Sequence, residues 1–156
     1  MNDICYHRQE KPYTCGPACL RMLLSPYGDF SEMLLATLAG TIIWGTTPLG
    51  LARAARLVGY DAKVIRHADV EDLKDNLPSI VLINPGVLIG SRPSRHGHFL
   101  LVKEVKSDSL IVNDPMPIFG GENIILDLET FLAAWEIMDS WLISIGSEKD
   151  GKNSID

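Results

Sequence analysis

Residues 98–115 read HFLLVKEVKSDSLIVNDP and contain two apolar runs of strand length. The runs, Phe99–Val105 and Leu110–Val112, have the Val and Ile content that is typical of strands. The pair Ser107-Asp108 between them is typical of a tight turn. The segment therefore predicts an antiparallel hairpin.

Outside this hairpin, the chain divides into a helical first third and a β-rich second half. Helices are predicted where apolar residues recur at helical spacing, at Gly16–Ser25, Phe30–Ala39, Thr47–Gly59, Asp69–Asn76 and Glu129–Met138. Further strands are predicted at Asp61–Arg66, Ile80–Ile83, Ile124–Leu128 and Trp141–Ile145. Helices followed by strands indicate an α+β fold, with N-terminal helices packed on a mostly antiparallel β-sheet.

The size and composition of the chain are those of one globular domain. It has 156 residues, of which 46% are hydrophobic and 22% are charged, so neither a disordered chain nor a second domain is expected. The domain is predicted to span residues 1–146, followed by a flexible polar tail at residues 147–156. The net charge of −6 argues against a nucleic-acid partner, which requires a basic surface.

One uncharged stretch, Met33–Ala52, is long enough to cross a bilayer. Eight of its residues are Thr, Gly or Pro, which interrupt the apolar pattern and favour a turn instead of a membrane span. The N-terminus lacks the apolar core of a secretory signal, and the cysteine count of 3 is odd. We therefore expect reduced thiols in a cytoplasmic protein, where an unpaired cysteine is free to act as a nucleophile.

Cys15 is the cysteine whose position best suits a nucleophile. It stands at the predicted start of the first helix, where unpaired amides and the helix dipole favour a thiolate over a thiol. The alternative is a buried structural thiol, because free cysteine is among the most buried residue types. Gln9, six positions earlier, is close enough in an extended segment for its amide to donate a hydrogen bond to an oxyanion.

The hairpin supplies a candidate base for such a thiol. His98 opens one strand and Asp114 closes the next, so pairing brings the two side chains near each other. Asp114 can then accept a hydrogen bond from one imidazole nitrogen while the other nitrogen faces the thiol. His96 competes for the same role, since in an extended segment it shares a face with His98.

These residues resemble the bacterial cysteine peptidases of the C39 and C39-like families, over roughly Gln9 to Trp141. The resemblance rests on four ordered segments: Gln9 to Leu20 with its Cys15-Gly16-Pro17-Ala18 core, Gly45 to Gly59, Gly97 to Val102, and Val112 to Pro115. It implies a papain-like fold and a peptidase without cofactor or metal. Its roles fall on Cys15 as nucleophile, His98 as base and then acid, Asp114 as the residue that orients the imidazole, and Gln9 as oxyanion donor.

Members of the C39 family proper cut leader peptides after a pair of glycines, usually as a domain of a peptide exporter. The resemblance therefore implies a peptide or precursor protein as substrate, cut after small residues, and a separate exporter as partner. The chain departs from the family pattern at Thr14, where an acidic residue often precedes the cysteine, and in the long segment 84–97. Arg92 and Arg95 in that segment suit pairing with acidic residues of a peptide, although a plain solvated loop is the better explanation of them.

Several alternatives remain open at this level. The same fold can hold a peptide without cutting it, and an acyl-enzyme can pass its acyl group to an amine instead of water. Cys15, His96, His98 and Asp114 also have donor types that suit zinc. Cys19, four residues after Cys15, suits core packing or a resolving thiol, and Cys5 has no predicted role.

Overall fold

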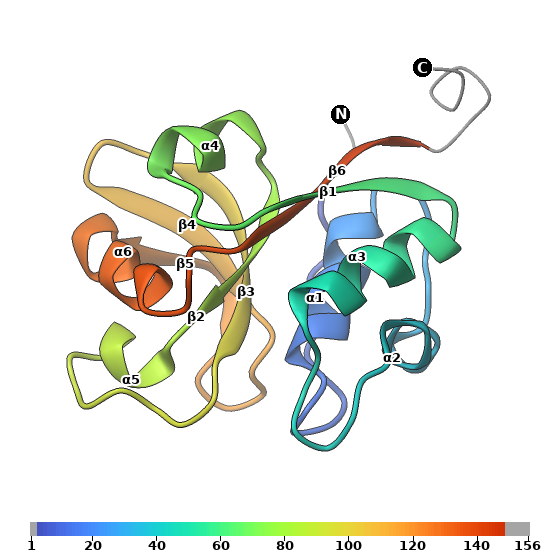
Figure 1. Ribbon diagram of the computed structural model, residues 1–156, viewed down its shortest axis with the longest axis horizontal. Coiled ribbons are helices and arrows are strands. Elements are labelled where there is room, and N and C mark those ends of the chain that lie inside the picture. The colour runs from blue at the N-terminus through green and yellow to red at the C-terminus, as the bar shows by residue number, and fades with distance from the viewer. Residues whose placement is uncertain (1–2, 149–156) are drawn as a thin grey trace.

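A helical layer and a β-sheet lie side by side in the computed structural model, which describes residues 3–148 (Figure 1). The sheet is fully antiparallel, with six strands in the order β1-β6-β2-β3-β4-β5. Its strands are β1 (Tyr60–Ile65), β2 (Ser79–Ile83), β3 (His98–Val105), β4 (Ser109–Asp114), β5 (Gly121–Asp127) and β6 (Leu142–Glu148). The α+β fold and the β3–β4 hairpin predicted from the sequence are therefore confirmed.

All of the helices except α1 begin where a side chain just before the helix accepts hydrogen bonds from its first amides. The bounds are α1 (Cys15–Leu24), α2 (Glu32–Ala39), α3 (Pro48–Leu57), α4 (Val70–Asp75), α5 (Pro85–Leu88) and α6 (Leu128–Glu136). Thr47 and Asp127 cap α3 and α6 through their side chains, and Asp69 forms a capping box with Asp72. Each such cap contributes about 1 kcal/mol of helix stability. All of the predicted helices are present, each within a few residues of its expected limits.

The sheet separates two hydrophobic cores because neighbouring residues of a strand point to opposite faces. In β3, Phe99 and Leu101 pack with α1, α2 and α3, whereas Leu100 and Val102 pack with α6. The apolar residues of β2 and of the first half of β3 are therefore buried on both faces of the sheet.

Three features differ from the sequence-based expectations or lie beyond them. The short helix α5 was not predicted, and it interrupts the segment 84–97 immediately after β2. β6 continues to Glu148, past the domain limit predicted at residue 146. The rest of the predicted tail, residues 149–156, lies outside the described residues, so its flexibility stays a prediction.

The uncharged stretch Met33–Ala52 spans most of α2, a turn and the first half of α3. Gly40 ends α2 in the left-handed conformation, with a φ of 72°, and Pro48 opens α3. Among residues 3–148, no helix has both the length and the apolar character needed to span a membrane.

The ends of several helices and strands from both layers lie at one edge of the molecule. The first residues of α1 and β3 and the last residues of β4 lie together at the lower edge in Figure 1. The loop between α2 and α3 reaches the same edge. The candidate residues Cys15, His98 and Asp114 belong to these ends.

Candidate active site

Cys15 occupies the first position of α1 and is half-buried. The preceding residue, Thr14, makes no side-chain hydrogen bond to the first turn of the helix. The amides at this helix start are therefore not capped by Thr14, and together with the helix dipole they can stabilise negative charge that develops on a bound substrate.

His98 is buried and lies between Cys15 and Asp114. Its Nε2 donates a 2.7 Å hydrogen bond to Asp114 Oδ1, which leaves Nδ1 as the nitrogen for the thiol. Burial lowers the pKa of His98, but the hydrogen bonds to Asp114 and Cys15 outweigh burial and raise this pKa to about 9. The structure therefore brings the predicted thiol, imidazole and carboxylate together, with the imidazole hydrogen-bonded to the carboxylate and close to the thiol.

Asp114 is held by two contacts that the sequence did not indicate. Its Oδ1 also accepts a 3.0 Å hydrogen bond from the backbone amide of Met116. The hydroxyl of Tyr6 donates a 2.6 Å hydrogen bond to the backbone carbonyl of Asp114. These bonds fix the carboxylate behind the imidazole, because they restrain both its side chain and its backbone.

Gln9 is buried, and its side-chain amide nitrogen already donates two hydrogen bonds. Nε2 donates to the backbone carbonyls of Lys11 and Pro12, at 2.9 and 3.3 Å, and Oε1 has no hydrogen-bond partner. The side chain thus holds the loop that leads into Cys15. Donation to an oxyanion requires that Gln9 release one of these carbonyls, of which Pro12 makes the longer bond.

A cleft of about 380 Å³ opens over Cys15 between the helical layer and the sheet. Ile43 and Trp44, on the loop between α2 and α3, form one wall, and both are more than two-thirds exposed at 68% and 71%. The indole of Trp44 stacks on the imidazole of His96 across the cleft, with ring centroids 5.9 Å apart. This apolar wall was not predicted from the sequence.

His96 therefore has a different environment from His98, although the sequence left both as candidates for the base. It is exposed, precedes β3 and stacks on Trp44, whereas His98 contacts Asp114. Within residues 3–148, no group of three or more His, Cys, Asp or Glu side chains has the arrangement needed to hold a metal ion. The zinc alternative consequently has no support from the geometry.

The other two cysteines and the two candidate arginines lie in environments that differ from that of Cys15. Cys19 is completely buried, and burial raises the pKa of its thiol well above the ordinary value, which suits core packing and not a resolving thiolate. Cys5 is exposed and unpaired. Arg92 and Arg95 are exposed on the loop before β3.

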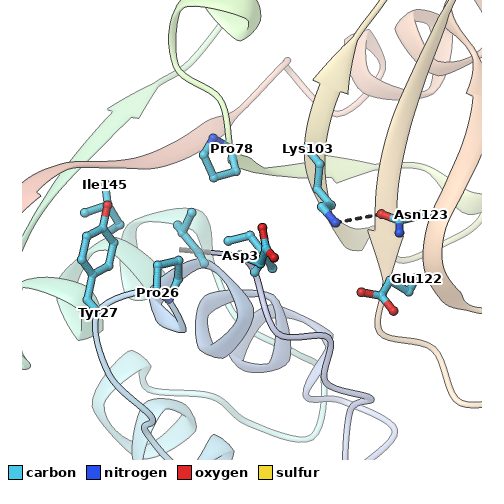
Figure 2. Close-up of a pocket in the computed structure, with 10 residues that line it drawn as sticks. Asp3, Pro26, Tyr27, Pro78, Lys103, Glu122, Asn123 and Ile145 are labelled. Atoms are coloured by element: carbon cyan, nitrogen blue, oxygen red, sulfur yellow. Dashed lines mark hydrogen bonds between the residues drawn. The ribbon is translucent and has the colours of Figure 1, made fainter. Parts of the chain in front are cut away.

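A second cavity, of about 500 Å³, is larger than the cleft, but none of the candidate catalytic residues lines it (Figure 2). Its walls combine apolar residues such as Leu23, Pro26 and Ile145 with a few charged groups. Lys103 donates a 2.7 Å hydrogen bond to Asn123 at its rim. The candidate thiol therefore lines the smaller of these two cavities.

Comparisons with known proteins agree on one family. The Peptidase C39 family matches residues 3–143. The chain is 34% identical over 114 residues to the pediocin PA-1 transport/processing ATP-binding protein of Pediococcus acidilactici, covering 72% of this chain and 15% of that protein. It is 35% identical over 116 residues to an uncharacterised protein of Methanothermobacter marburgensis, covering 74% of each. The chain spans between 15% and 17% of the length of the transport proteins that it matches first.

A solved structure extends the similarity to three dimensions. The peptidase domain of Streptococcus ComA, described as a bi-functional ABC transporter involved in a quorum-sensing pathway, superposes with a TM-score of 0.75. It is 27% identical, and the match covers 92% of this chain and 100% of that domain. The fold is therefore the papain-like one that the sequence resemblance implied.

Proposed function

The chain belongs to the peptidase C39 family and is a cysteine peptidase domain, and on this premise we propose that Cys15, His98 and Asp114 are its catalytic residues. The observation that carries the proposal is the buried His98 imidazole, which is hydrogen-bonded to Asp114 and lies close to the Cys15 thiol. A nucleophile, a base and a group that orients the base are the parts that covalent catalysis requires.

In the proposed reaction, His98 holds the proton of Cys15 and the thiolate attacks the carbonyl carbon of a peptide bond. His98 then transfers that proton to the leaving amine, and the acyl group stays on the sulfur. Water loses a proton to His98 and attacks the thioester, which releases the carboxylic acid and restores the thiol. Asp114 stabilises the imidazolium that exists between these steps.

The oxyanion of the tetrahedral intermediate needs donors close to the sulfur. We propose the backbone amide of Cys15, at the positive end of α1, as one donor and Gln9 as the other. Gln9 supports this role by its position in the loop before Cys15, and its present bond to Pro12 is the one we expect substrate to replace.

For the substrate, we propose a leader or precursor peptide that is cut after small residues. The cleft that contains Cys15, of about 380 Å³, is lined by the stacked rings of Trp44 and His96, and we expect these rings to restrict which side chains fit beside the thiol. Two relatives are named as transport and processing proteins for lactococcin G and pediocin PA-1, which makes a peptide exporter the proposed partner. The free cysteines suit a reducing compartment, so we propose that cleavage occurs in the cytoplasm.

Cleavage of a synthetic precursor tests the proposal. A peptide with a leader that ends in Gly-Gly is incubated with the wild-type protein and with Cys15→Ala, and the products are identified by mass spectrometry. A second peptide with Leu-Leu at the same place serves as the control. We expect a single cut after Gly-Gly by the wild type only. If an amine is added, acyl transfer gives a product that carries the amine, whereas hydrolysis gives the free acid. An intact peptide that binds both proteins equally would instead identify a non-catalytic binding domain.

A further inference from the structure

A buried carboxylate, Glu32, stands behind the loop that delivers Cys15. Glu32 is the first residue of α2 and only 2% exposed, although glutamate is almost never buried unless it is paired. It is not one of the groups used in the proposed reaction. The reason for its burial is therefore sought in its hydrogen bonds.

Those contacts all go to the segment from Glu10 to Thr14. Both carboxylate oxygens accept from the backbone amide of Glu10, at 3.1 and 2.9 Å. Thr14 Oγ1 accepts from the amide of Lys11 and donates to the Lys11 carbonyl, both at 3.0 Å. The carboxylate thus fastens the start of the loop to the helical layer, and Thr14 closes the loop on Lys11.

Gln9, the residue before Glu10, is hydrogen-bonded to the residue that follows β4. The backbone amide of Gln9 donates a 2.8 Å hydrogen bond to the carbonyl of Pro115, which directly follows Asp114. Two consecutive amides are therefore tied in different directions, Gln9 to the sheet and Glu10 to α2. The segment that follows these two residues leads to Cys15, so their hydrogen bonds help to set where the thiol lies relative to the His98–Asp114 pair.

We propose that Glu32 is a positioning residue for the peptidase reaction, which aligns Cys15 and Gln9 with His98 by holding residues 10–14. This inference rests on the proposed function and deepens it. A charge is well suited to the task, because hydrogen bonds to an ionised acceptor are shorter and about twice as strong as neutral ones.

The surroundings of Glu32 make this alignment sensitive to acid. Burial raises the pKa of Glu32, while the bonds from Thr14 and from the Glu10 amide lower it in part. The charged groups that act on it are Glu10 and Arg21, and Arg21 also forms ion pairs with Glu10 and Asp29, at 3.4 and 3.2 Å. Protonation of Glu32 removes an acceptor, so we expect the loop to loosen before the domain unfolds.

The test compares Glu32→Gln and Glu32→Ala with wild type. Glu10→Gln is the matched control, because it alters an exposed carboxylate of the same loop and keeps the backbone amide that Glu32 binds. Four quantities are measured: kcat, KM, the rate at which iodoacetamide alkylates Cys15, and the melting temperature. We expect Glu32→Ala to lower kcat about 10- to 100-fold at little change in KM, as for the loss of a hydrogen bond to a charged group.

Glu32→Gln keeps one acceptor oxygen and should recover part of kcat, but without the acid-side loss of activity that Glu32 protonation adds in wild type. Alkylation of Cys15 should slow in the same order as kcat. A folded Glu32→Ala protein with wild-type kcat and alkylation rate would overturn the proposal. If wild type does not cut the Gly-Gly peptide, the proposed function fails, whereas a slower alkylation in Glu32→Ala still supports the positioning role.

Discussion

Replacement of Asp114 by alanine removes the carboxylate that we propose orients the imidazole of His98. The lost interaction is the 2.7 Å bond between His98 Nε2 and Asp114 Oδ1, inside a site where the imidazole is only 6% exposed. Burial alone lowers the pKa of His98, so the bonds to Asp114 and Cys15 account for its rise to about 9. Without the carboxylate, the imidazolium is less stable and the thiolate that it accompanies is less populated.

The size of the effect follows from the kind of bond that is lost. A hydrogen bond to a charged group contributes about 1.5–3 kcal/mol. At about 1.36 kcal/mol for each factor of ten, this corresponds to a loss of about 10- to 150-fold in kcat/KM. The alkaline limb of the pH profile, which follows loss of the His98 proton, should move to lower pH by about one to two pH units.

The assay measures kcat/KM and the alkylation rate of Cys15 from pH 5 to 10, a window we choose to span about 6.5 and 9, the ordinary and raised pKa values of His98. Asp114→Asn should be intermediate, because the amide oxygen still accepts from His98 without a charge. Asp139→Ala is the control, since its 2.7 Å bond to Arg66 has the same length but is exposed. An Asp114→Ala protein that keeps the wild-type profile would refute the assigned role.

Three further outcomes are expected. Iodoacetamide at pH 6 should alkylate Cys15 faster than Cys5 or Cys19, as measured by peptide mapping, and equal rates would contradict an activated thiolate. Trp44→Ala should raise KM about 2- to 10-fold at little change in kcat, as for one lost aromatic contact, and an unchanged KM would remove the indole from the substrate site. Because the folded-state pKa of His98 is raised, its charge stabilises the fold fully below about pH 6.5, and this contribution disappears as the pH rises through about 9. Urea unfolding across this range should show the decline in wild type and a weaker one in His98→Gln.

Much of the secondary structure could be predicted because its causes are local. Pro17 suits the first turn of α1, Thr47 and Pro48 start α3, and Ser107-Asp108 turns the hairpin, all through contacts within a few residues. Helix α5 escaped prediction because a single turn has no apolar period to detect. Its only local signal was Asn84 before Pro85, a cap followed by proline.

The candidate site also has one part that could be predicted from the sequence and one part that could not. The residue types and order of Cys15, His98 and Asp114 were sufficient to predict a thiol, a base and an orienting group. Pattern could not separate His98 from His96, since both share a face in an extended segment. The structure separates them because only His98 reaches Asp114, while His96 stacks on Trp44.

The chemistry of this protein was accessible from its residues, because nucleophiles, bases and caps are properties of side chains and their immediate neighbours. The strand order, with the last strand between the first two in the chain, was not. Nor was the support of the site by Glu32 and Tyr6, whose partners lie 22 and 108 positions away. Such contacts form only when the two layers pack together, and the spacing of residues along the chain carries no information about which distant groups that packing will bring within hydrogen-bond distance.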